Sequence, residues 1–133
     1  KGQLPMKRSS HTMHYYNDKI YIFGGYTFPT DVNATKYLND LWEYSIHNNS
    51  WKELQSMLGY VPPGCAFHRT VIYKHYMVLF GGNNNSVSKK GIVYNELYLF
   101  NIKRHEWNQI ECYNKPKSLK AHGMCIIDNK LII

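Results

Sequence analysis

The sequence lacks the features that define several large classes of protein. Its longest apolar runs, such as residues 77–80, are far shorter than the roughly 20 residues that a membrane-spanning helix needs. No segment repeats apolar residues at the 3.6-residue period of a helix, so we expect little or no helix. No secretory leader is recognisable at Lys1, and the three cysteines (Cys65, Cys112 and Cys125) cannot all pair internally. We expect reduced thiols, no membrane partner and a cytoplasmic or nuclear location.

Acidic residues are scarce, and none lies in a catalytic motif. Nine Asp and Glu stand against 16 Lys and Arg, which gives a formal net charge of +7. The acids are scattered, and the chain contains no nucleophile elbow, Walker loop or zinc-protease motif. We therefore expect no enzymatic activity in this chain and no cofactor. Basic pairs such as Lys103-Arg104 belong to no recognised nucleic-acid module, so we favour an ordinary basic surface that would attract an acidic protein.

Tyrosine is abundant, and a repeat runs through the chain. Aromatic residues make up 15% of the sequence, including 12 Tyr, which favours half-buried strands. His11, His68 and His122 start three similar segments, separated by 57 and 54 residues. An apolar strand begins eight residues after each His. In the first two units it ends in a double glycine, Gly24-Gly25 and Gly81-Gly82.

The same register continues downstream of the double glycines. Trp42 matches Tyr98, and Trp51 matches Trp107, both at an offset of 56 residues. Four short strands fit each unit, and in the first unit we expect them at residues 10–16, 19–23, 40–46 and 51–54. This divides the chain into residues 1–54, residues 55–110 and the first half of a third unit, residues 111–133.

These units resemble kelch repeats, in which a double glycine follows an apolar strand, an aromatic residue lies in the third strand and a Trp in the fourth. The resemblance implies an all-β fold, a partial kelch-type β-propeller of four-stranded antiparallel blades. Two and a half blades cannot close a ring, so we expect a piece of a longer protein whose remaining blades pack against it. It also implies that Trp51 and Trp107 pack between adjacent blades, so that replacing either by Ala unfolds the chain.

The repeated histidines and the loops are the remaining candidates. We interpret His11, His68 and His122 as structural residues that hydrogen-bond loops within their own blades, because no close metal-ligand spacing is present. The resemblance to kelch repeats also implies that one face carries the loops at residues 26–37 and 83–94 and the connections at 55–67 and 111–121. Binding residues lie preferentially on loops held by a rigid scaffold. The candidate partner-binding residues are Arg8, which precedes the first strand, and on these segments Tyr26, Phe28, Tyr60, Asn83, Asn84, Lys89, Lys90, Lys115 and Lys117.

The expected function is protein–protein interaction through this loop face. Exposed aromatic residues would anchor the partner, and basic residues would favour an acidic one. The alternative is the regulatory or substrate-recruiting propeller of a multidomain enzyme, such as a kelch-linked phosphatase or a ubiquitin-ligase adaptor. A copper-radical oxidase would need a Tyr–Cys crosslink, and no feature of the sequence assigns one.

Overall fold

The first blade is an antiparallel sheet of four strands in the order β1-β2-β5-β6. The computed structural model describes residues 3–29, 34–55, 57–86 and 90–133. The strands of this blade are β1 (Thr12–Tyr16), β2 (Lys19–Phe23), β5 (Leu41–Ser45) and β6 (Ser50–Glu53). They follow the four predicted segments to within two residues at each end, because polar turns bound each apolar or aromatic run.

The second blade repeats this arrangement and gains one strand. Its members are β8 (Arg69–Tyr73), β9 (Tyr76–Phe80), β12 (Leu97–Asn101) and β13 (Glu106–Ile110). The connection at residues 55–67, which the sequence predicts as a loop, contains a short strand β7 (Leu58–Gly59). β7 pairs in parallel with β13 at the outer edge of the sheet. The segment between the blades thus closes the outer edge of the second blade.

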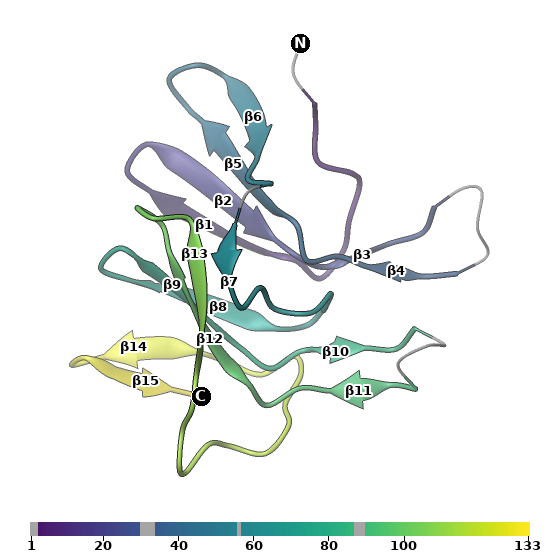
Figure 1. The fold of residues 1–133 in the computed structure, drawn as a ribbon, viewed down its shortest axis with the longest axis vertical. Coiled ribbons are helices and arrows are strands. Elements are labelled where there is room, and N and C mark those ends of the chain that lie inside the picture. The colour runs from purple at the N-terminus through teal and green to yellow at the C-terminus, as the bar shows by residue number, and fades with distance from the viewer. Residues whose placement is uncertain (1–2, 30–33, 56, 87–89) are drawn as a thin grey trace.

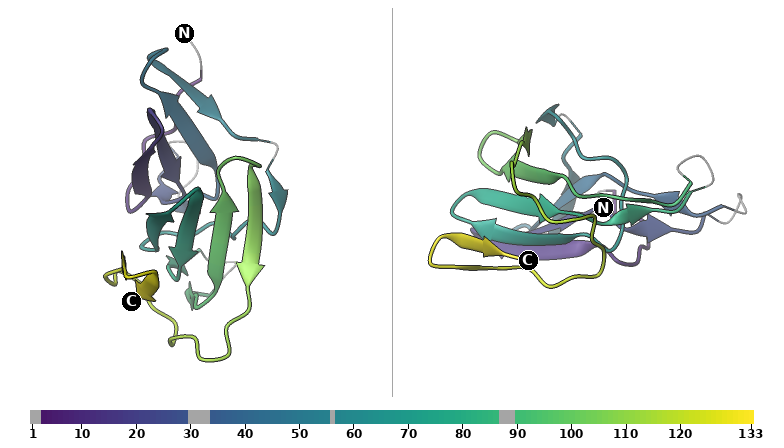
Figure 2. Two further views of the ribbon diagram at one scale, coloured as in Figure 1. Left: turned by 90° about the vertical axis from the view of Figure 1, so that its left-hand side faces the viewer. Right: turned by 90° about the horizontal axis from the view of Figure 1, so that it is seen from below.

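The third unit consists of one hairpin, β14 (Cys125–Ile127) and β15 (Lys130–Ile132). Its first strand lies next to β8, just as β8 lies next to β1, so the first strands of the three units are neighbours. Figure 1 and both panels of Figure 2 show the two blades and this hairpin stacked side by side. No helix occurs in the described residues. The fold is therefore all-β, as predicted, and forms part of a propeller.

Two small ribbons extend from the blades beyond the double glycines. β3 (Tyr26–Thr27) pairs with β4 (Lys36–Tyr37), and β10 (Asn83–Asn84) pairs with β11 (Ile92–Val93). The sequence predicts plain loops here, but backbone pairing resumes directly after the glycines. Both ribbons project to the same side of the molecule, on the right in Figure 1. The hairpin turns within the blades lie at the opposite end.

The core lies between the two blades, and Trp107 is at its centre. Trp107 is fully buried, with ring centroids of Phe23 and Phe100 both 5.0 Å away. Its repeat partner Trp51 is only half-buried, and its recorded ring contact is Tyr44 on the neighbouring strand. Both tryptophans occupy the face that points toward the preceding blade. The first blade covers Trp107, whereas no blade within the described residues covers Trp51, so the predicted equivalence of the two does not extend to burial.

The double glycines and the repeated histidines fit against each other. A Cβ on Gly24 would lie 2.9 Å from Cε1 of His68, and one on Gly25 would lie 3.0 Å from Cβ of His11. Both glycines also have positive φ, 64° and 90°, which other residues rarely adopt. Gly81 meets His122 in the same way, at 3.0 Å. Each double glycine therefore receives the His of its own blade on one residue and the His of the next blade on the other.

Candidate functional site: the loop face

We use the term loop face for the side of the molecule that carries the two ribbons and the connections leading into the second and third units. Backbone hydrogen bonds tie these segments together. Gly25 N donates to Cys65 O (2.9 Å), and Gly82 N donates to Leu119 O (2.8 Å), so each connection is fixed to the preceding blade. The predicted sharing of one face by ribbons and connections is therefore what the structure has. A rigid backbone supports the side chains displayed there.

An aromatic cluster of Tyr26, Phe28, Tyr37 and Phe67 lies on the loop face. Tyr26 is its centre: its ring centroid lies 5.4 Å from that of Phe28 and 6.1 Å from those of Tyr37 and Phe67. Phe28 is 70% exposed and Phe67 is 36% exposed. Phe67 comes from the second unit and the other three from the first. The cluster thus spans two units and offers apolar rings to solvent in one place.

A shallow pocket of about 250 Å³ adjoins the cluster, and basic residues surround it. Lys7, Arg8 and Ser9 line one part, and Tyr26, Thr27 and Phe28 line the other. Lys7 and Lys36 are exposed. Arg8, in contrast, is committed to Asp40: its Nη1 lies 2.6 Å from Oδ1, and its side chain is only 4% exposed. Lysine side chains are therefore the charges that a partner meets at this pocket.

Three of the predicted binding residues are not on the surface. Arg8 is held by its bidentate pair with Asp40, as described above. Asn83 and Asn84 are 1% and 6% exposed, because these two residues form β10 and lie against the connection at Gly64 and Ala66. Asn84 Nδ2 donates to Gly64 O at 2.8 Å. Arg8 and Asn84 hold the backbone beneath the loop face, whereas the Asn83 side-chain amide is buried with no hydrogen-bond partner among the described residues. The assignment of these three side chains as partner contacts is corrected here.

The other predicted residues are dispersed. Tyr60 is 73% exposed but lies at the outer edge of the second blade, where its backbone N donates to Trp107 O. Lys90 is exposed at the tip of the second ribbon. Lys115 and Lys117 are exposed on the connection before the third unit. Lys89 lies outside the described residues. Among the described members of the predicted set, Arg8, Tyr26 and Phe28 line one pocket, and of these Tyr26 and Phe28 belong to the aromatic cluster.

Sequence reasoning missed Phe67 and Lys36. A usable signal existed for Phe67. It occupies the position before the repeated His, where the other two units have Ser10 and Ala121. All three residues have positive φ, between 53° and 57°. The other two units have small residues at this position, so the Phe67 ring is not needed for the packing that all blades share. Its presence indicates a local role at the surface.

The repeated histidines differ in their hydrogen bonds. His68 contacts the connection of its own unit, where its Nδ1 lies 3.5 Å from Cys65 Sγ, and it also bonds across to the first blade. His11 Nδ1 and both ring nitrogens of His122 are buried with no hydrogen-bond partner among the described residues, so the expected bonds to loops are not seen for these atoms.

His68 Nε2 is 3.1 Å from Thr12 Oγ1, and His14 Nε2 is 2.6 Å from Thr70 Oγ1; both pairs cross from one blade to the other. Burial, together with the charge of Arg69, lowers the pKa of His68 to about 3. The ring is therefore neutral at physiological pH. Among the described residues, no group of three or more His, Cys, Asp or Glu is placed to hold a metal ion.

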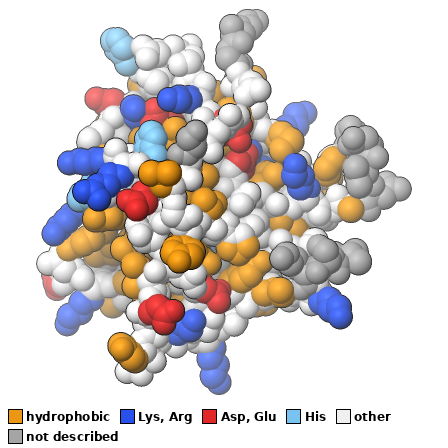
Figure 3. Space-filling view, viewed as in Figure 1, with side chains coloured by type: hydrophobic (Ala, Val, Ile, Leu, Met, Phe, Trp, Pro, Cys, Tyr) orange, Lys and Arg blue, Asp and Glu red, His pale blue; other side chains and the backbone are white. Residues whose placement is uncertain are grey.

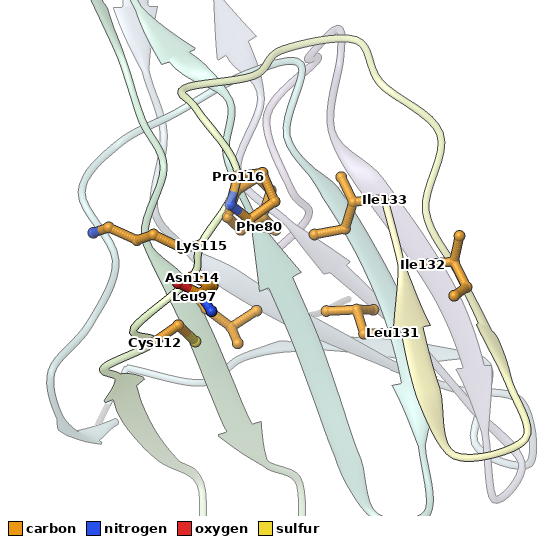
Figure 4. A pocket seen from close by; sticks show the side chains of 9 residues that line it. All are labelled: Phe80, Leu97, Cys112, Asn114, Lys115, Pro116, Leu131, Ile132 and Ile133. Atoms are coloured by element: carbon orange, nitrogen blue, oxygen red, sulfur yellow. The ribbon is translucent and has the colours of Figure 1, made fainter.

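A pocket of about 510 Å³ lies between the second blade and the β14–β15 hairpin. Figure 4 shows Leu131 and Ile133 on the side of β15 that faces Phe80, with Ile132 on the other side. Phe80 is the repeat partner of Phe23, which packs against Trp107 of the following blade. The pocket beside Phe80 therefore corresponds to the space beside Phe23 that Trp107 fills between the first and second blades. We assign it to packing between blades and not to a small ligand.

These stacked four-stranded sheets, with a double glycine after each second strand, define a kelch-type β-propeller segment. No helix in the described residues is long and apolar enough to cross a membrane. The chain belongs to the KLHDC2/KLHL20/DRC7 Kelch-repeats domain family, and the match to the model of this family covers residues 1–133. Domains of this family are in general protein-interaction modules and are typically non-catalytic.

Several characterised proteins contain a similar segment. Leucine-zipper-like transcriptional regulator 1 of Homo sapiens is 28% identical over 143 residues, which cover 100% of this chain and 16% of the relative. Kelch domain-containing protein 10 of Xenopus tropicalis is 26% identical over 136 residues, covering 97% of this chain and 32% of the relative. The chain therefore spans a third or less of the length of these relatives. A solved structure titled "Structure of YjhT" has the same fold, with a TM-score of 0.67 at 18% identity over 88% of this chain and 41% of its own.

Proposed function

We propose that this chain binds another protein through the loop face, with the aromatic cluster as the anchor. The observation that supports the proposal most is the placement of Phe28. Its ring is 70% exposed, yet it stands edge-on to Tyr26, which is held by Phe67 and Tyr37. A large apolar side chain that is exposed but positioned by its neighbours loses little conformational entropy on binding. Such residues are the ones that contribute most at protein interfaces.

The charges around the cluster favour an acidic partner. Lys7 lines the shallow pocket, and Lys36 is exposed on β4, where it pairs with the pocket residue Thr27. Among the described residues, Asp40 is already paired with Arg8. Complementary charge of this kind raises association rates and selects against basic partners. We infer a partner segment that combines an apolar or aromatic side chain with nearby Asp or Glu.

A second candidate function is the recruitment of a substrate or regulator to a larger enzyme. The relatives favour it, because the matched segment is a small part of each. In the Rho GTPase-activating protein gacHH of Dictyostelium discoideum it covers 7% of the relative, at 28% identity over 127 residues.

The free thiols of Cys65, Cys112 and Cys125 suit a reducing compartment, and we propose the cytoplasm or nucleus.

A peptide library displayed on phage tests the proposal. We expect selection on the wild-type chain to enrich peptides with an aromatic residue next to Asp or Glu. Phe28→Ala should then lower the affinity for the enriched peptides at least about 30-fold, as expected for a residue that anchors an interface. Ile127→Ala is the matched control, because Ile127 is 57% exposed on the opposite, turn-bearing end. Equal binding by Phe28→Ala and wild type, or equal loss with both variants, would contradict the proposal.

A further inference from the structure

A basic cluster lies at the end of the second blade opposite the loop face. It consists of Lys74 and His75 in the turn between β8 and β9, and Lys103, Arg104 and His105 in the turn between β12 and β13. In Figure 3 basic side chains gather along the left edge of the molecule, which is the end that carries these turns in Figure 1. We call this set the turn cluster. It is separate from every residue used in the proposed function.

The two turns are held next to each other by hydrogen bonds. Ile102 N in the second turn donates to His75 O in the first, at 3.0 Å. Asn101 Oδ1 accepts from the backbone N of both Lys103 and Arg104, at 3.0 and 3.1 Å. These bonds fix the backbone from which the basic side chains project. The turn cluster is therefore a built surface, and not a set of charges on mobile loops.

Ring contacts position the side chains further. The His75 ring packs on Tyr76 with centroids 4.2 Å apart, and the His105 ring stacks on Phe100 at 6.2 Å and 15°. Lys74 Nζ lies 5.1 Å from the centroid of the Tyr73 ring. Such contacts reduce the entropy that a long side chain loses when it binds a ligand. They leave the polar atoms of the cluster free to meet solvent or a partner.

The Lys and Arg side chains of the turn cluster form no ion pair among the described residues. The two ion pairs recorded there join Arg8 to Asp40 and Lys19 to Glu43. Lys74, Lys103 and Arg104 thus carry three positive charges, and Glu106 is the acid that follows them directly in the sequence. Three unpaired cations on two adjacent turns form a site for an anionic segment.

We propose that the turn cluster binds a short acidic peptide segment, independently of the loop face. The four strands that carry the turns are spaced about 4.8 Å apart, so their backbones span about 14 Å and the cluster with its side chains about 15–20 Å. An extended peptide advances about 3.3 Å per residue, so four to six residues with several Asp or Glu would cover it. A nucleic acid would need a longer positively charged track and aromatic faces for base stacking. The aromatic rings here are instead covered by the basic side chains.

A labelled hexapeptide of Glu and Asp tests this proposal by fluorescence anisotropy on the full chain. We expect Lys103→Gln with Arg104→Gln to weaken binding about five- to tenfold at 0.1 M salt. Lys115→Gln with Lys117→Gln removes the same charge from another exposed segment and should change the affinity less than twofold. Circular dichroism verifies that both double variants are folded. Phe28→Ala, which disables the loop face, should leave hexapeptide binding unchanged, so the two proposals can fail separately.

Three outcomes would overturn the proposal. Equal weakening by the two double variants would show that net charge alone governs the affinity. Loss of hexapeptide binding in Phe28→Ala would place the acidic segment on the loop face. A single-stranded oligonucleotide of equal charge that binds at least as tightly, and also loses affinity in Lys103→Gln with Arg104→Gln, would identify nucleic acid as the ligand.

Discussion

Replacing the two repeat-equivalent tryptophans should have very different effects on stability. Trp107 is fully buried and contacts Phe23 of the first blade, Phe100 and Tyr98, with ring centroids 5.0, 5.0 and 6.4 Å away. Truncating a buried Trp to Ala removes its transfer free energy and leaves a cavity, at a cost of about 3–5 kcal/mol. That is a large part of the roughly 5–15 kcal/mol that stabilises a typical domain.

Trp51→Ala should cost much less, about 1–2 kcal/mol, because only part of the ring is buried and one aromatic contact, with Tyr44, is lost. Urea unfolding followed by far-UV circular dichroism gives both free energies from the midpoint and slope. If Trp107→Ala does not fold, Trp107→Phe and Trp51→Phe provide a milder pair with the same expected order. Equal losses in the two positions, or a larger loss at Trp51, would refute the assignment of the core to the space between the blades.

Three further predictions follow from the contacts between and within blades. Gly24→Ala should destabilise the chain by about 1–3 kcal/mol, since its φ is 64° and the new Cβ would lie 2.9 Å from His68, whereas Gly123→Ala, with no atom within 4 Å, should be close to neutral in thermal melts. The free energy of unfolding should fall as the pH drops from 6.5 toward 3, by up to about 1.4 kcal/mol per pH unit, because burial keeps His68 neutral in the folded state while the unfolded chain takes up the proton. His68→Gln should flatten this pH dependence in urea titrations. An unchanged slope in that variant would exclude His68 as its source. Arg8→Ala should cost about 1–3 kcal/mol, because the side chain is 4% exposed and Asp40 would lose its partner, whereas Lys19→Ala, at 43% exposure, should cost less than about 1 kcal/mol; similar losses would contradict the burial of the first pair.

The repeat made most of the fold predictable from sequence. Strand positions followed from alternating apolar and turn residues, because those patterns are local and recur in each unit. The short strand β7 was missed, because it pairs with backbone atoms of a distant segment, such as Gly59 beside Trp107. The two ribbons were missed as well, because each strand in them is only two residues long. The half-buried state of Trp51 was also missed. Burial there depends on whether a blade precedes it, which the residue and its neighbours do not encode.

The candidate site was predictable only in part. Tyr26 and Phe28 could be found because they are aromatic residues on a loop of a recognisable scaffold. The burial of Asn83 could not be predicted, because Tyr26, which occupies the equivalent position in the first unit, is half-exposed. Residues that differ between the repeat units, such as Phe67, are candidates for a binding role at the surface. An alignment of the units shows which positions differ, but it does not show on which side of the backbone their side chains lie.

The stacking of the first blade on the second is the claim on which the loop face depends, because its aromatic cluster joins Phe67 of the second unit to Tyr26 of the first. Nuclear Overhauser contacts between the Trp107 indole and the Phe23 ring test it most directly, because these residues come from different blades and their centroids are 5.0 Å apart. We predict strong contacts between the two rings, together with contacts from the His68 ring to Phe23. Contacts from Trp107 to residues of its own blade alone would show that the two blades do not pack as described.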